Sequence, residues 1–582
     1  MDYADDASQH IKEKSCSLTP IQWLLSCDSL DHVNLSECLS STGRFSCCAL
    51  CATSLSCLYR DPIHNEFKLS CLRALCNHLQ LMLQLRTMRE MANCELPLDA
   101  KVYVRALKKE EVLNGDMTVI VKDLLLLAIS NGTYDARWRV LILYVTRVFD
   151  IDISLVDSIE LTIVNCLSNF SPAQTEQEQV AAARRLRISK TKRYAMIGLA
   201  SIGGGIAIGL TGGLAAPLIG TGLTSILGSS AILGAIGTLG GSAVVGSLFG
   251  VAGASLTGYK MHKRVGDIEE FQFHKLSTGA VTGDVHLHIT IAVSGWLIDE
   301  NETSYTQPWG YLQESPEQYY LRYESSYLLE LGRAMEYFLT FAVTVAVQES
   351  LKFTVLSGLI AAIAWPAGIL GLASVIDNPW GVCCRRSAQV GKQLAETLLT
   401  HSHGNRPVTL IGYSLGARVI YYCLREMSQR EKSHGIVQDA IMIGTPCTRN
   451  TTEWNKITQV VAGRVVNAYC RSDWLLKFLY RTLSMHTHGV AGLEAVQTEG
   501  IENIDLTDIV SGHFDYPQKM TEIMMHIGVR VNETAKRILI STHSMPEAMC
   551  DNLKLNDENN SVPKSKSANE LAIISSENDY RG

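Results

Sequence analysis

The pentapeptide GYSLG at 412–416 combines residue types and spacing that point to nucleophilic chemistry. A short apolar run at 407–411 precedes it and is typical of a buried strand, and the apolar residues at 417–424 can begin a helix. Strand, G-x-S-x-G and helix in this order form a nucleophile elbow, a sharp turn from which the serine Oγ projects above a sheet. The two glycines lack a Cβ, which lets the strand and the helix approach each other closely. We therefore predict that Ser414 is a nucleophile.

A serine nucleophile of this kind needs an acid and a histidine, which follow it in that order along the chain. Asp473 comes just after a strand predicted at 464–470, where its carboxylate can orient a histidine; the alternative role is capping of the next helix. His513 follows the last predicted strand and can act as a general base; an ordinary solvated loop histidine is the alternative. His486 and His488 precede that strand, so we favour His513.

The oxyanion of an acyl-transfer intermediate needs backbone N–H donors. The N–H of Leu415 lies at the start of the helix that follows the serine, and it is the first predicted donor. The second should come from the loop after the strand predicted at 286–293. There the N–H of Trp296, which follows Gly295, is the candidate.

Strands and helices alternate between residues 283 and 530, which predicts a parallel sheet and the α/β fold class. Together with the elbow, this alternation predicts an α/β-hydrolase fold for that region. The predicted strands are 286–293, 318–323, 407–411, 439–444, 464–470 and, with weaker signals, 501–510.

The chain of 582 residues is long enough for several domains. Residues 1–190 are leucine-rich, and stretches such as 67–91 and 119–148 place apolar residues at helical spacing. We expect a helical packing or interaction region there, without catalytic residues. Residues 541–582 are rich in Asn, Ser, Lys and Glu, which predicts a disordered tail.

The stretch 195–259 contains no charged residue and no histidine, and it is rich in glycine. It has room for two passes of about 20 residues each, and its small residues spaced four apart let helices pack closely in lipid. Basic residues flank both ends, including Arg187 and Lys263, which favours two cytosolic ends. We predict a transmembrane hairpin over 191–262; a hairpin that inserts part-way or packs on protein is the alternative.

A second apolar run, 353–376, lies between two strands that should share one sheet. A single membrane pass there would place the two strands on opposite sides of the bilayer. The run must therefore be a re-entrant hairpin, a helix buried against the sheet or a helix lying on the bilayer, and we favour the last two.

Composition excludes several classes of protein. Apolar residues make up 47% of the chain and charged residues 19%, so it is not disordered overall, and a net charge of −7 argues against nucleic acid as a partner. The first residues lack the pattern of a secretory signal peptide, so we expect the 17 cysteines to be reduced thiols. Cys48 and Cys51 form a C-x-x-C, but no second pair completes a zinc site, and we expect no metal and no cofactor.

Several short motifs accompany the elbow, and together they carry a resemblance to a known family. They are SGWL at 294–297, QPW at 307–309, DNPW at 377–380, GYSLGAR at 412–418, GTP at 444–446, SDW at 472–474 and GH at 512–513. Over about residues 190–530 the chain resembles the transmembrane and coiled-coil domain-containing protein 4 family. The resemblance implies an α/β-hydrolase fold in a membrane-associated eukaryotic protein, with Ser414, Asp473 and His513 in the triad positions.

Two functional hypotheses follow. The first is a membrane-anchored serine hydrolase, esterase- or lipase-like, which acts on a lipid or another ester. The second is a non-catalytic membrane-trafficking scaffold that uses a hydrolase fold for binding, with residues 1–190 contacting protein partners. Both make the chain a multi-pass protein of an intracellular membrane, with the hydrolase domain facing the cytosol. An intact Ser, Asp and His set favours the enzyme, although a fold alone does not fix a function.

Overall fold

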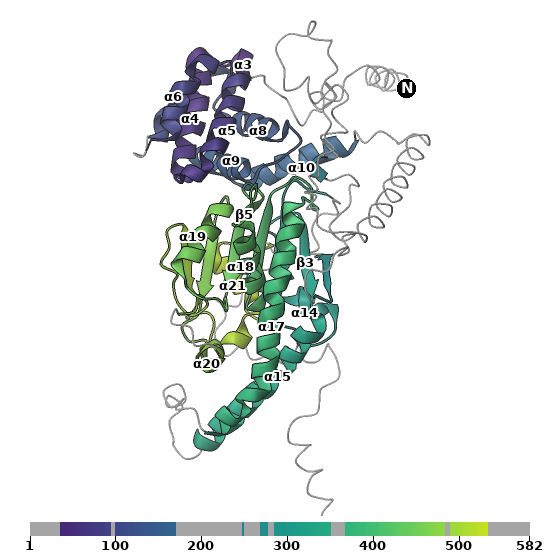
Figure 1. Ribbon diagram of the computed structural model, residues 1–582. Coiled ribbons are helices and arrows are strands. Elements are labelled where there is room, and N and C mark those ends of the chain that lie inside the picture. The colour runs from purple at the N-terminus through teal and green to yellow at the C-terminus, as the bar shows by residue number, and fades with distance from the viewer. Residues whose placement is uncertain are drawn as a thin grey trace, which may run out of the picture.

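The structure, a computed structural model, describes residues 35–94, 99–169, 247–249, 268–276, 285–350, 367–483 and 489–532. Figure 1 shows a helical region, built from the first part of the chain, packed on one end of a region with a central sheet. Each region has its own hydrophobic core of buried side chains.

Some predictions fall outside the described residues. These include the tail at 541–582, His486 and His488, and the glycine-rich hairpin apart from one helical turn at 247–249. Within the described ranges, no helix combines the length and the apolarity that a membrane crossing requires.

The central sheet has seven strands in the order β1-β3-β2-β4-β5-β6-β7. Its strands are β1 (Phe271–Lys275), β2 (Ile289–Val293), β3 (Glu317–Tyr323), β4 (Val408–Tyr413), β5 (Val437–Ile443), β6 (Val465–Tyr469) and β7 (Ile501–Asp505). β1 pairs antiparallel with β3, and the other neighbours pair in parallel. β2, β4 and β6 are buried along their whole length, as strands covered on both faces are. The predicted α/β class is confirmed.

All six predicted strands are present, with ends that differ by a few residues. β7 stops at Asp505: the Leu506 N–H still donates to the Tyr469 carbonyl of β6 at 2.8 Å, and the Leu506 carbonyl then accepts the N–H groups of Ile509 and Val510 in a short turn. β1 is an additional strand at the sheet edge, and only alternate side chains of its sequence FQFHK are buried. The sheet therefore begins before residue 283, and the boundary predicted there is too late.

The crossover helices cover the sheet and extend beyond it. They are α14 (Glu302–Thr306), the 3-10 turn η5 (Gln307–Trp309), α15 (Ser325–Ser350), α17 (Ala367–Leu399), α18 (Leu415–Met427), α19 (Thr451–Val460), α20 (Trp474–Leu483), the 3-10 turn η6 (His513–Asp515) and α21 (Met520–Ile527). α15 runs outward past the sheet (Figure 1). The predicted apolar insert at 353–376 contributes its residues from Ala367 onward to α17, and 353–366 lie outside the described residues.

The helical region contains α3 (Leu35–Cys38), α4 (Ser41–Leu58), η1 (Pro62–His64), α5 (Asn65–His78), η2 (Met82–Gln84), α6 (Leu85–Ala92), α7 (Ala100–Leu107), η3 (Glu111–Leu113), α8 (Thr118–Ile129), α9 (Ala136–Val148) and α10 (Ser154–Asn169). Each of the two long helical stretches predicted at 67–91 and 119–148 is divided by a turn. The second division holds Gly132, whose φ is +76°, and Asp135, whose carboxylate accepts the Arg137 N–H and begins α9.

The helical region docks against the amino ends of the strands. The Tyr134 N–H donates to the Asn405 carbonyl at 2.9 Å, just before β4, and the Ala136 N–H donates to the Gly435 carbonyl at 2.8 Å, just before β5. Ser414 follows the carboxyl end of β4, at the opposite edge of the sheet. The helical region therefore lies away from the predicted nucleophile.

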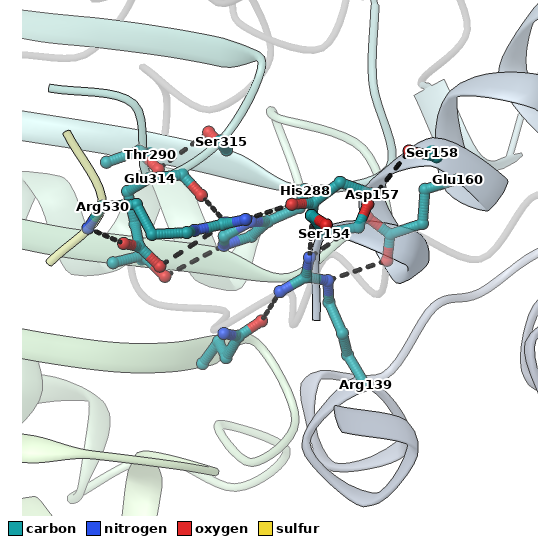
Figure 2. A network of polar contacts seen from close by, with 12 residues as sticks. Arg139, Ser154, Asp157, Ser158, Glu160, His288, Thr290, Glu314, Ser315 and Arg530 are labelled. Carbon is teal, nitrogen blue, oxygen red and sulfur yellow. Dashed lines mark hydrogen bonds and ion pairs between the residues drawn. The ribbon is translucent and has the colours of Figure 1, made fainter. Parts of the chain in front are cut away.

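A buried polar network joins the two regions (Figure 2). Arg139 on α9 is 1% exposed and forms ion pairs with Glu160 at 2.8 Å and with Asp157 at 2.9 Å. Its Nη1 also donates to Oε1 of Gln438 on β5 at 2.8 Å. Arg530, near the end of the sheet region, forms a second ion pair with Asp157. The Arg139 guanidinium thus contacts two carboxylates of the helical region and one strand of the sheet.

We expect Arg139→Ala to lower the free energy of unfolding by about 3–5 kcal/mol, because it leaves the buried Glu160 carboxylate without its main cation. Arg86→Ala is the matched control, since Arg86 is 91% exposed and its pair with Glu90 is worth about 0.5 kcal/mol or less. Urea denaturation of the full chain in detergent measures both. Equal midpoints for the two variants would show that the network contributes nothing.

Candidate active site

Ser414 occupies a strained turn between β4 and α18. Its φ of +52° and ψ of −123° are rare for a residue with a Cβ and cost about 1–3 kcal/mol. The turn is tight because its glycines touch backbone: a Cβ on Gly412 would lie 2.9 Å from the Gly416 carbonyl carbon, and a Cβ on Gly416 would lie 2.0 Å from the Val293 oxygen. The G-x-S-x-G spacing thus packs the start of α18 directly on the end of β2.

We expect Gly416→Ala to lower the free energy of unfolding by about 1–3 kcal/mol, because the new methyl group overlaps the backbone of β2. Gly310→Ala is the control, since a Cβ there would meet only the Gln307 oxygen, at 3.5 Å. Denaturant midpoints of the two variants measure the difference. A Gly416→Ala protein as stable as the control would contradict the close contact at the elbow.

The structure brings the three predicted residues into one hydrogen-bonded chain. The Ser414 Oγ lies 2.7 Å from Nε2 of His513, and Nδ1 of His513 lies 2.6 Å from Oδ2 of Asp473. The side chains come from the carboxyl ends of β4, β6 and β7, which meet at one edge of the parallel sheet. With the proton on Nδ1, the imidazole donates to the carboxylate and accepts from the serine hydroxyl, as a general base must.

Asp473 fills both roles that the sequence left open. Its Oδ2 faces His513, and its Oδ1 accepts the N–H of Leu476 at 2.9 Å, in the first turn of α20. The helix contact fixes the carboxylate, which in turn fixes the imidazole. The capping role and the predicted role in orienting the histidine are therefore compatible.

Two aromatic rings hold the imidazole of His513. The indole of Trp296 stacks on it at 5.1 Å between ring centroids, and the ring of Tyr516 meets it edge-on at 5.3 Å. Burial, and then the Asp473 carboxylate, raise the pKa of Tyr516 well above its ordinary value, so this phenol stays neutral. From the sequence we predicted a role only for the backbone N–H of Trp296, and the contact of its ring with His513 was not predicted. The one feature of the sequence that could have indicated this contact is an aromatic residue directly after Gly295.

The loop that carries Trp296 lies against the elbow. A Cβ on Gly295 would lie 2.6 Å from the Ser414 Cβ and 3.1 Å from the Leu415 nitrogen, so only glycine fits there. The Tyr323 hydroxyl donates to the Ser294 carbonyl at 2.9 Å and fixes the loop from below. The two backbone segments predicted to hold the oxyanion, at Leu415 and at 295–296, are therefore neighbours.

α15 spans this edge of the sheet, from the loop after β2 to the start of α20. At one side its Gly332 packs on the Leu297 carbonyl, and the Leu297 N–H donates to the Leu328 carbonyl at 3.3 Å. At the other side Phe338 stacks on Trp474, at the start of α20, with ring centroids 6.0 Å apart. Ser414, His513 and Asp473 are each at most 1% exposed. The three side chains are therefore buried in this structure.

Residues 189–530 match the family described as "Protein of unknown function (DUF726)". The chain belongs to this family. The match includes all seven strands and every residue of the site described above. No solved structure matches this DUF726 protein significantly.

Three relatives of this DUF726 protein carry printed names that bear on its function. An uncharacterized membrane protein from Caenorhabditis elegans is 45% identical over 71% of this chain and 67% of its own length. A rice protein named "Transmembrane and coiled-coil domain-containing protein STS1" is 38% identical over 68% of this chain and 61% of its own length. A Saccharomyces cerevisiae protein named "Probable lipase MIL1" is 33% identical over 73% of this chain and 40% of its own length. The match thus spans about two thirds of the first relative and less of the others.

The rice protein's name shares the words "transmembrane and coiled-coil domain-containing protein" with the family that the sequence resembles. The narrower assignment, to the protein 4 family, stays a prediction. Three of the similar proteins are named as membrane or transmembrane proteins, which supports membrane association of the family.

Proposed function

We propose that this protein is a membrane-anchored serine hydrolase with an α/β-hydrolase fold, and that it cleaves an ester, most simply a lipid ester. The observation that carries the proposal is the chain from Ser414 through His513 to Asp473, with contacts of 2.7 Å and 2.6 Å behind a strained elbow. The elbow context supports the fold assignment. The name of the yeast relative, "Probable lipase MIL1", supports the reaction class.

In the proposed reaction the Ser414 Oγ attacks the ester carbonyl carbon while His513 Nε2 takes the hydroxyl proton. The N–H groups of Leu415 and Trp296 stabilise the oxyanion that forms. Collapse of the intermediate expels the alcohol, which takes its proton from His513, and leaves an acyl-serine. A water, deprotonated by the same imidazole, then releases the acid. Asp473 holds the imidazole and stabilises its charged form throughout.

The lipid preference rests on the surroundings of the serine. α15, which spans the edge of the sheet that holds the site, contributes the apolar side chains of Leu328, Met335 and Phe338 to the core of this region, all at most 1% exposed. An acyl chain that displaces these contacts would find an apolar surface. Two relatives are named as membrane or transmembrane proteins, which supports a lipid substrate.

The test is turnover of p-nitrophenyl esters with acyl chains of increasing length by the full chain in detergent micelles. We expect hydrolysis that rises from short to long acyl chains and that a Ser414→Ala protein lacks. Equal release of p-nitrophenol by the two proteins would overturn the proposed function.

For the membrane anchor we propose a two-pass hairpin over 191–262 with both ends, and the hydrolase region, on the cytosolic face. Basic residues at both ends and an uncharged stretch long enough for two passes support it. Tags inserted near Arg187 and near Lys263 should show the same protease sensitivity in sealed vesicles. Protection of one tag and digestion of the other would mean an odd number of passes.

The second candidate function is a membrane-trafficking scaffold that binds proteins through the helical region. Its support is that this region docks at the sheet edge opposite Ser414, and that it displays exposed apolar side chains such as Leu83, 95% exposed, and Met82, 50% exposed. A wild-type chain that turns over no ester but captures protein partners through this surface would favour the scaffold.

A further inference from the structure

A polar cleft lies beside the proposed active site and is lined by residues that the proposed reaction does not use. Its volume is about 360 Å³, within the range of small-molecule sites, and its walls are α18, α20, the loop from β5 to α19 and the first turn of α19. Both helices begin at the proposed site, α18 after Ser414 and α20 after Asp473. Arg418 is four residues beyond Ser414, about 6 Å along the helix axis.

Arg418 lines this cleft without a carboxylate partner in the described part of the chain. Its guanidinium donates to two backbone carbonyls, of Cys384 at 3.1 Å and of Pro446 at 2.7 Å, and to the Tyr422 hydroxyl at 3.3 Å. It also lies 4.7 Å from the centre of the Tyr422 ring. These contacts fix the side chain but do not neutralise its charge.

The other charges of the cleft leave an excess of positive charge. Arg425, on the same helix, forms an ion pair with Glu453 at 2.8 Å. Lys456 shares that carboxylate at 3.0 Å. Lys456 does not line the cleft, so the charged residues of the lining are the two cations Arg418 and Arg425 and the one carboxylate of Glu453.

Neutral hydrogen-bond donors complete the lining. Burial raises the pKa of Tyr421 and of Tyr480, so both keep their hydroxyl protons at neutral pH. The Asn450 side chain also lines the cleft; its Oδ1 accepts the Thr452 N–H at 3.0 Å, and its amide NH₂ is a neutral donor group. Two arginines and several neutral groups offer more hydrogen-bond donors than the two oxygens of a carboxylate can accept. A phosphate group, which has more acceptor oxygens, suits this lining better.

We propose that the cleft binds the phosphate group of a phosphate ester, with Arg418 and Arg425 as its cationic anchors. The phosphate can belong to a lipid headgroup or to a soluble compound, since the same donors recognise both. The site concerns binding and does not require Ser414 to be a nucleophile.

The experiment uses the full chain carrying Ser414→Ala in micelles of an uncharged detergent. Phosphatidic acid, diacylglycerol with the same acyl chains, and inorganic phosphate are the three probes. We expect phosphatidic acid to bind more tightly than diacylglycerol. Arg425→Gln should weaken its binding about tenfold, since it removes a charge-assisted contact, and Glu453→Gln should strengthen it by removing the competing carboxylate.

Arg430→Gln is the matched control, because Arg430 follows the end of α18, pairs with Glu396 and Glu426, and does not line the cleft. Tighter binding of phosphatidic acid than of inorganic phosphate would identify a lipid headgroup, and equal binding would identify a soluble phosphate; both support the site. Equal affinities for phosphatidic acid in the parent, Arg425→Gln and Glu453→Gln proteins would overturn it, as would equal binding of diacylglycerol.

Discussion

Ser414→Ala should reduce ester turnover by about 10⁶-fold, because the variant lacks the hydroxyl that forms the acyl intermediate. The variant should remain folded. Alanine keeps the Cβ and the backbone of the turn, and the contact that it removes is the one hydrogen bond to His513. Initial rates with a p-nitrophenyl ester, together with the denaturant midpoint, separate loss of chemistry from loss of fold.

Ser433→Ala is the matched control for this prediction. Ser433 is also fully buried, but it lies before β5, at the edge of the sheet opposite Ser414. We expect this variant to keep the wild-type rate. A Ser414→Ala protein that keeps more than a tenth of the wild-type rate would remove Ser414 from the mechanism.

His513→Ala should lower turnover nearly as far as Ser414→Ala, because the serine hydroxyl then has no base and the residues act as a unit. Asp473→Asn should lower it about 10⁴-fold. Asparagine can still accept the Leu476 N–H through its oxygen, but its NH₂ then faces Nδ1 of His513 and favours the tautomer that protonates Nε2. Turnover by both variants, measured beside Ser414→Ala, gives the ranking.

His403→Gln serves as the control for the histidine, since His403 is buried at 1% exposure and lies before β4, away from the site. It should retain turnover. Full activity in His513→Ala, with loss in a variant of His486 or His488, would reassign the base.

The sequence predicted which three side chains the structure brings together, because each of them stands in a local pattern. The elbow is defined by five consecutive residues, and Asp473 and His513 each follow a strand whose apolar run is visible in the chain. Parallel pairing then brings the carboxyl ends of β4, β6 and β7 together, so chain order alone suggests which side chains meet.

Features that depend on long-range packing could not be predicted in this way. β1 is a short edge strand with polar residues, and its partner β3 lies about fifty residues later in the chain, so no local apolar run marks it. The ring of Trp296 on His513, and the ring of Phe338 on Trp474, join segments that only the folded sheet brings together. The Arg139 network likewise joins α9 to β5, far apart in sequence.

Covalent labelling with a fluorophosphonate probe tests the proposed nucleophile most directly, because the probe modifies an activated serine whatever the natural substrate is. Incubation of the full chain in detergent, digestion and mass spectrometry of the peptides locate the adduct. We expect one adduct, on Ser414, that is absent from the Ser414→Ala protein and strongly reduced in His513→Ala. A wild-type chain that never labels, or that labels equally after Ser414→Ala, would contradict the assignment of Ser414 as the nucleophile of a serine hydrolase.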